Sequence, residues 1–122
     1  MSEERGQRFA FGIAESAIAE AGQVPLDALH FDVDAICRAY DSIKPVAERL
    51  GVPPPAPHVA GFCCAPLAGL GARILFPKGS EPFVLPILQS PEEIDALEEP
   101  EDYLASELTR QRLAPARELR GD

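Results

Sequence analysis

The sequence predicts an α+β fold that is mostly helical and contains one β-hairpin. Apolar residues recur at helical spacing over residues 5–21 and again over residues 33–50. Two short extended segments, residues 72–76 and 82–88, flank a turn that contains a proline and a glycine. The 122 residues are enough for one domain that buries about two thirds of its unfolded surface. We therefore expect a single structural unit.

Composition and charge restrict the classes of partner. The chain is 46% hydrophobic and 25% charged, which is typical of a globular protein. Its net charge of −9 disfavours nucleic acid and anionic membranes, because both attract clustered Lys and Arg. No apolar run approaches the roughly 20 residues of a membrane span, and the first residues carry acids where a signal peptide is basic. These features predict a cytoplasmic protein.

Three segments divide the chain. Residues 1–51 form a helical segment, and residues 52–57 form a stiff proline linker because each Pro fixes φ. Residues 58–122 hold a short helix, the hairpin and two further helices. Three cysteines, two of them adjacent, do not suit a disulfide framework, and reduced thiols are expected.

Two helices are expected in the first segment. The first covers residues 5–21, has an alanine-rich apolar face and stops at Gly22. The second follows the apolar stripe of residues 33–50 and begins at Asp32 as its N-cap. Pro45 interrupts the hydrogen-bond ladder inside this stripe, so the helix should kink or restart there and give two segments along one face.

The third segment starts with a small-residue helix from residue 65 or 66 and continues into the hairpin. Pro82 and Pro86 lack backbone donors, so the second strand should be an edge strand or only partly paired. Ser90 and Glu93 form a capping box for a short acidic helix. A last helix is expected from residue 102 to about residue 119, and Pro115 is a position at which it can end early.

The hairpin and the acidic helix after it also carry a family resemblance. The run GARILFPKGSEPFV leads to SPEEIDALEEPEDY, and this order resembles the amino-terminal part of the uroporphyrinogen decarboxylase (URO-D) superfamily, which includes the cobamide-dependent methyltransferases. The resemblance covers the whole chain loosely and residues 65–102 best. It implies the opening region of a (β/α)8 barrel protein without the barrel, which needs about 250 residues. The implied partner is the missing barrel continuation or another protein.

The resemblance implies an activity for full-length relatives, namely methyl transfer from a corrinoid or porphyrinogen decarboxylation. Methyltransferase members hold zinc through a His-x-Cys pair and a later Cys in the carboxy-terminal portion of the barrel, and no His-x-Cys occurs here. The decarboxylase branch carries an early Arg-Gln-Ala-Gly-Arg segment, whereas this chain has only the late Arg110-Gln111-Arg112. The methyltransferase branch is the better match. The chain alone is expected to lack catalysis, a cofactor and known catalytic residues.

Two groups of polar residues are candidates for chemistry. His30, Asp32 and Asp34 form the cluster HFDVD, which suits a metal or a base with an orienting carboxylate. Their spacing matches no standard site, and both acids suit a helix start, so a structural role is favoured.

His58, Cys63 and Cys64 offer one nitrogen and two sulfurs, which suits zinc or a thiol redox site. Adjacent thiolates do not easily reach one tetrahedral ion, so packing of small residues is favoured. The acidic run over residues 92–102 is interpreted as a solvated face.

A second hypothesis treats the chain as a stand-alone helical interaction module. It would dock through the stripe of residues 33–50 or through an uncovered face of the hairpin. Its basis is that a short chain with surfaces suited to a barrel would leave large apolar patches in water, and such patches usually mark interfaces.

Overall fold

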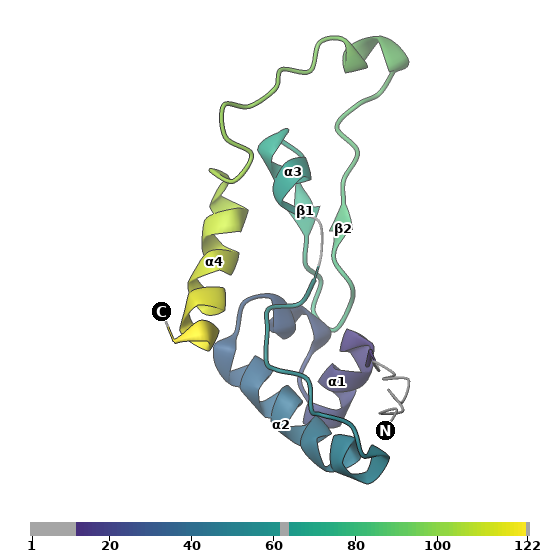
Figure 1. Cartoon of the computed structure of the whole chain (residues 1–122). Coiled ribbons are helices and arrows are strands. Elements are labelled where there is room, and N and C mark those ends of the chain that lie inside the picture. The colour runs from purple at the N-terminus through teal and green to yellow at the C-terminus, as the bar shows by residue number, and fades with distance from the viewer. Residues whose placement is uncertain (1–11, 62–63, 122) are drawn as a thin grey trace, which may run out of the picture.

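The computed structural model describes residues 12–61 and 64–121. It has the α+β class, with helices and one two-stranded antiparallel sheet in the described residues. Figure 1 shows the first helices of the chain packed at the base, the hairpin standing above them and the last helix running alongside. In chain order the elements are α1 (Glu15–Gly22), η1 (Leu26–His30), α2 (Val33–Leu50), α3 (Cys64–Gly69), β1 (Ile74–Leu75), β2 (Phe83–Val84), η2 (Pro91–Ile94) and α4 (Glu107–Arg120). Within the described ranges, no helix has the length and apolar character needed to cross a membrane.

The hydrophobic core lies in this helical base, where α2 packs against α1 and η1. Most of the stripe predicted for residues 33–50 faces inward, and Ile36 and Tyr40 on it are almost completely buried, whereas Leu50 at its end is exposed. Asp32 caps the helix as predicted, because its carboxylate accepts a hydrogen bond from the Ala35 amide at 3.2 Å. Docking through this stripe would require α1 and η1 to move away, since they already cover most of it.

Helix α1 is short and ends differently from the prediction. It begins at Glu15 because the preceding residue is extended, and residues 1–11 lie outside the described ranges. Gly22 was expected to lie just after the helix, but it is the last helical residue. The C-cap is Gln23, which has a positive φ of 54°. A Cβ at Gly22 would come within 2.5 Å of the Ala39 Cα. The glycine is thus needed for the close approach of α1 to α2.

The restart expected at Pro45 is also wrong, since α2 continues through it as one helix of 18 residues. Pro45 removes one backbone hydrogen bond, but its ring is exposed to solvent. Ile43 and Ala47 on either side of it are buried. The burial of these two residues outweighs the lost hydrogen bond and keeps the helix whole.

The hairpin forms where predicted, with paired strands of only two residues each. Ile74 pairs with Val84, Leu75 pairs with Phe83, and the Leu85 amide donates to the Arg73 carbonyl at 2.9 Å. This register turns positions 82, 84 and 86 away from β1, so both prolines lie on the outer edge, where no ladder donor is needed. The prediction of a partly paired edge strand is confirmed. The fixed φ of the prolines explains why regular pairing ends so soon.

The turn of the hairpin is attached to the base. The Gly79 amide donates to the Asp27 carboxylate in η1 at 2.7 Å, and Gly79 adopts a positive φ of 73°. The Phe76 ring packs edge-on against Phe31, with centroids 4.8 Å apart. These contacts hold the lower end of the hairpin, whereas its upper part extends away from the base (Figure 1).

The capping box at Ser90 and Glu93 is present, but it holds only one 3₁₀ turn, η2. The Glu93 carboxylate accepts a hydrogen bond from the Ser90 amide at 3.2 Å. Every residue of the turn is exposed. Without a packed face the turn does not propagate into the predicted helix, because most helical stability in proteins comes from packing.

Helix α4 differs from the prediction at both ends. Ser106, rather than a residue near 102, is the N-cap, and its hydroxyl accepts from the Thr109 amide at 3.2 Å. Pro115 does not end the helix; it is buried inside it. The helix joins the two halves of the molecule, because it contacts both α3 and α2 and its Arg112 donates to the Ala60 carbonyl after the linker.

Candidate docking site

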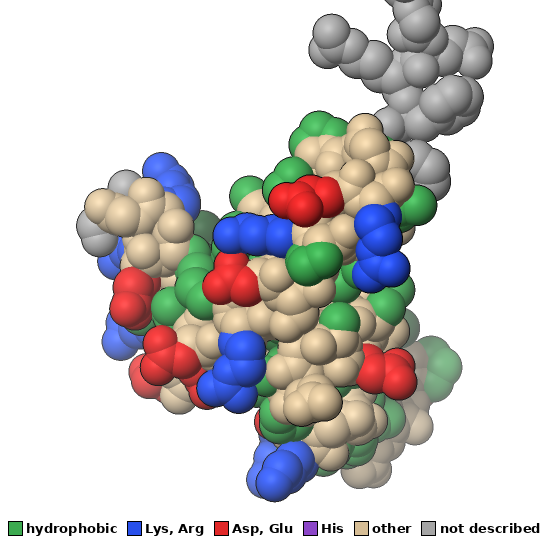
Figure 2. Space-filling model, turned by 90° about the horizontal axis from the view of Figure 1, so that it is seen from below, with side chains coloured by type: hydrophobic (Ala, Val, Ile, Leu, Met, Phe, Trp, Pro, Cys, Tyr) green, Lys and Arg blue, Asp and Glu red, His purple; other side chains and the backbone are tan. Residues whose placement is uncertain are grey.

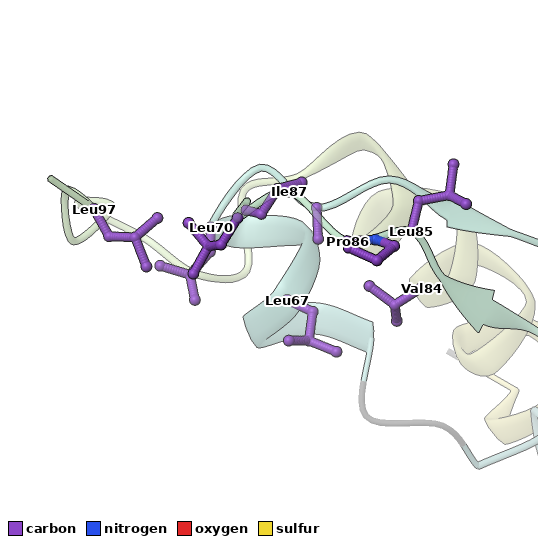
Figure 3. A pocket seen from close by; sticks show the side chains of 9 residues that line it. Leu67, Leu70, Val84, Leu85, Pro86, Ile87 and Leu97 are labelled. Atoms are coloured by element: carbon purple, nitrogen blue, oxygen red, sulfur yellow. The ribbon is translucent and has the colours of Figure 1, made fainter. Parts of the chain in front are cut away.

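An apolar groove lies above the helical base, between α3, the chain that leaves β2 and the segment after η2 (Figure 3). Its volume is about 270 Å³. The lining residues are Leu67, Leu70, Ala72, Val84, Leu85, Pro86, Ile87, Leu88 and Leu97. None of them carries a polar side chain, so the groove can bind apolar groups but offers no acid, base or metal ligand.

The local sequence explains how these segments meet. Gly69 ends α3 against Tyr103, and a Cβ at Gly69 would come within 3.0 Å of the Tyr103 Cα. This close approach brings the chain that follows η2 back beside α3. The extended chain over residues 83–88, FVLPIL, supplies the opposite wall without polar alternation. An extended segment that is apolar on both faces requires other segments to pack on both faces. The hairpin only pairs with it along one edge.

Large apolar side chains of the groove remain open to water. Leu67 is 38% exposed, Ile87 43% and Leu97 37%. Phe83 and Ile94, in β2 and η2, are about half exposed as well. By contrast, the face seen from below in Figure 2 intersperses acidic and basic side chains with scattered apolar ones. A gathering of exposed apolar side chains of the first kind is typical of an interaction surface.

The structure separates the three residues of the HFDVD cluster. Asp32 is exposed and caps α2, Asp34 is exposed in its first turn, and His30 is buried at the end of η1. The ring of His30 stacks edge-on against Phe76, with centroids 5.1 Å apart. Neither ring nitrogen has a hydrogen-bond partner among the described residues. The structure therefore gives the two acids and the histidine different surroundings.

Burial lowers the pKa of His30 below its usual value of 6.5, and the positive charge of Arg112 lowers it further. The carboxylates of Glu15 and Asp27 oppose this shift. His30 is thus held neutral between the base, the hairpin and α4. His30 does not line the groove, and within residues 12–61 and 64–121 no second titratable group is in hydrogen-bond contact with it.

His58 is exposed after the linker, and its Nδ1 lies 3.1 Å from the Tyr40 hydroxyl. Burial, together with the carboxylate of Glu15, raises the pKa of Tyr40 to about 12. Cys63 lies outside the described residues, and Cys64 is described only as the first residue of α3. In the ranges that the structure describes, no three His, Cys, Asp or Glu side chains are grouped to hold a metal.

The groove residues could not be predicted from polar clusters, because groove formation depends on leucines that are far apart in sequence. One local signal was available. The run FVLPIL is too apolar for a half-exposed hairpin strand, so it indicates a segment that expects cover from elsewhere. The sequence pattern reveals this need but not the identity of the cover.

Comparisons with protein-family models, with curated proteins and with solved structures found no match for this chain.

Proposed function

We propose that this chain is a protein-docking segment equivalent to the amino-terminal region of a URO-D-like protein of the cobamide methyltransferase type. The open apolar groove carries the proposal. In this role the groove seats on a catalytic (β/α)8 barrel. The barrel would bind the zinc and the corrinoid and perform methyl transfer to a thiol, while this chain supplies binding surface.

The energetics favour docking through the groove. Fully burying a Leu or Ile side chain stabilises by roughly 1.5–3 kcal/mol, so covering those that are about two-fifths exposed contributes about 1 kcal/mol each. Leu67, Ile87 and Leu97 are in this state. Their joint burial offsets part of the cost of ordering two molecules. A surface of this kind gains more from a partner than from water.

The distribution of titratable groups favours binding over chemistry. Among the described residues, the groups whose pKa values are displaced are His30, Tyr40 and Lys44, and none of them lines the groove. The pKa of Lys44 is raised by its ion pair with Asp41 at 2.9 Å on the surface of α2. A catalytic site would combine displaced pKa values with a concave surface, and here the two features are apart.

The direct test is binding to the barrel. The fluorescently labelled chain is titrated with each URO-D-like barrel protein encoded by the same genome, and transfer of a methyl group from methylcobalamin to a thiol is assayed with and without the chain. We expect submillimolar binding to one barrel, loss of that binding in Leu67→Asp, and no transfer by the chain alone.

Leu50→Asp is the matched control, because Leu50 is also exposed but lies at the end of α2, away from the groove. It should bind like the unchanged chain. Failure of every barrel to bind, or equal binding by Leu67→Asp, contradicts the proposal.

A stand-alone interaction module is a second candidate, supported by the closed core of the helical base. Ile36 and Ala39 are fully buried without any partner, so the base has the packing of an independent unit. In this case the groove docks on a protein that has no barrel. Sedimentation at high micromolar concentration and binding of an apolar dye test the shared premise. A monomer that binds no dye would remove the support for both candidates.

A further inference from the structure

We infer that the groove binds a basic amphipathic helix of its partner, with apolar side chains in the groove and Lys or Arg along its margins. This inference rests on the proposed docking function and specifies the chemistry of the partner. It depends on three features: the acidic surroundings of the groove, the absence of polar groups inside it and the blocked edge of β2.

The chain that builds one wall and one end of the groove is strongly acidic. Residues 81–102 contain eight Asp or Glu residues and no Lys or Arg, and all eight acids are exposed. Six of the eight lie within four positions of the lining residues Leu88 and Leu97. The other wall, residues 64–72, carries no charged residue. A partner with basic margins therefore meets attractive charge there, and an acidic partner meets repulsion.

The interior of the groove does not suit a small ligand. Small-molecule sites usually combine roughly 300–1,000 Å³ with a few polar groups that orient the ligand. This groove is about 270 Å³, is open and has only apolar lining residues. Rows of apolar side chains spaced three and four residues apart on a helix suit such a groove without further polar contacts.

The outer edge of β2 is closed to an added strand. In the register of the hairpin, the outward positions are Pro82, Val84 and Pro86. Only Val84 among them has a backbone N–H, so an incoming strand would find one donor between two prolines. The partner must therefore bind through its side chains, as a helix does. A second copy of this chain is disfavoured, because each copy carries a net charge of −9.

The test uses two labelled peptides with the same leucines at helical spacing, one with Lys and one with Glu at the flanking positions. Binding to the full chain is measured by fluorescence anisotropy at low and at high salt. The Lys peptide should bind at least tenfold more tightly than the Glu peptide at low salt, and the difference should shrink at high salt. Leu67→Asp should abolish binding of both.

Charge reversal by Glu98→Lys with Glu99→Lys should weaken binding of the Lys peptide at least threefold. Glu48→Lys on α2 should leave this binding unchanged. Equal binding of both peptides, sensitive to Leu67→Asp, would overturn the basic partner and leave the docking function standing. Binding of neither peptide, together with no binding of an apolar dye, would overturn both. Binding of the Lys peptide that survives Leu67→Asp would place the contact outside the groove and also overturn the inference.

Discussion

The helical base and the hairpin half, which holds α3, β1, β2 and η2, both contain many apolar side chains. They bury these side chains to different extents. In the base, Leu29, Ile36 and Tyr40 are almost completely buried. Around the groove, Leu67 and Leu97 remain more than a third exposed. The difference comes from coverage: α1 and η1 pack on the stripe of α2, whereas the hairpin pairs along one edge only. An apolar pattern determines which face is to be buried, and a second segment must be present to bury it.

Hydrogen exchange should give the largest contrast between the two regions. Amides of residues 36–43 should exchange only through global unfolding, whereas those of Ile74 and Leu75 should open locally at a small fraction of that free energy. Native-state exchange measured by NMR tests this order. Equal protection in both regions would mean that the hairpin half has a complete core of its own, and the motive for docking would disappear.

The same truncation should cost very different amounts in the two regions. Leu29→Ala removes a side chain that is 1% exposed and should lower the free energy of unfolding by about 3–4 kcal/mol. Leu97→Ala, the matched change in the groove, should cost about 1 kcal/mol or less because its side chain is 37% exposed. Urea denaturation measures both. A loss of more than about 2 kcal/mol for Leu97→Ala would show that the groove is already packed.

Gly22→Ala tests how closely the base is packed. The new Cβ would meet the backbone of Ala39, which cannot move aside as a flexible side chain can, so we expect a loss of about 2–3 kcal/mol. Gly12→Ala is the control, because a Cβ at Gly12 has nothing within 4 Å. Thermal unfolding of the two variants provides the comparison. A neutral Gly22→Ala would mean that α1 and α2 separate easily.

The contrast between the regions also explains how much the sequence could predict. The stripe of residues 33–50 and the cap at Asp32 were predictable, because helical period and capping are local signals that packing then reinforced. Pro45 and Pro115 were misjudged for the opposite reason. Each proline is unfavourable within a helix. Burial of the residues on either side of Pro45 keeps α2 whole, and burial of Pro115 itself keeps α4 whole.

The sequence could predict that residues 83–88 must be covered, but it could not predict the groove itself. The apolar run of residues 83–88 indicates a segment that requires cover, but the return of the chain after η2 to α3 depends on the close approach of Gly69 and Tyr103, which are far apart in sequence. The isolation of His30 from Asp32 was equally hidden, since burial at the end of η1 depends on the hairpin ring of Phe76. Long-range contacts of this kind leave no mark at fixed spacing.

His30 makes the junction between the two regions sensitive to pH. Because its pKa is lowered in the folded protein, the unfolded chain takes up a proton first as the pH falls through about 6.5. The contribution of His30 to the free energy of unfolding should be largest above this pH and should decrease as the pH falls below it. The decrease should stop below the pKa of His30 in the folded protein. His30→Phe, which keeps a flat ring, should remove this part of the pH dependence.

His58→Asn is the control, because it removes the other histidine and leaves His30 in place. It should retain that pH dependence. Denaturation of the three proteins between pH 7.5 and pH 5 supplies the comparison. If the His30→Phe variant loses stability with falling pH as steeply as the unchanged chain, His30 does not couple protonation to folding.

Two serine caps should give the smallest effects and separate the regions once more. Ser106 caps α4, whose Thr109 and Pro115 are buried, so Ser106→Ala should lower the free energy of unfolding by about 1 kcal/mol. Ser90 caps η2, an exposed turn with no packed face, so Ser90→Ala should change that free energy by less than about 0.5 kcal/mol and should only loosen the turn. Equilibrium urea unfolding measures both variants. A partner seated in the groove should raise the cost of Ser90→Ala, because η2 lies between the groove residues Leu88 and Leu97. An equal cost of about 1 kcal/mol for both serines in the free chain would mean that the exposed turn unfolds together with the helices.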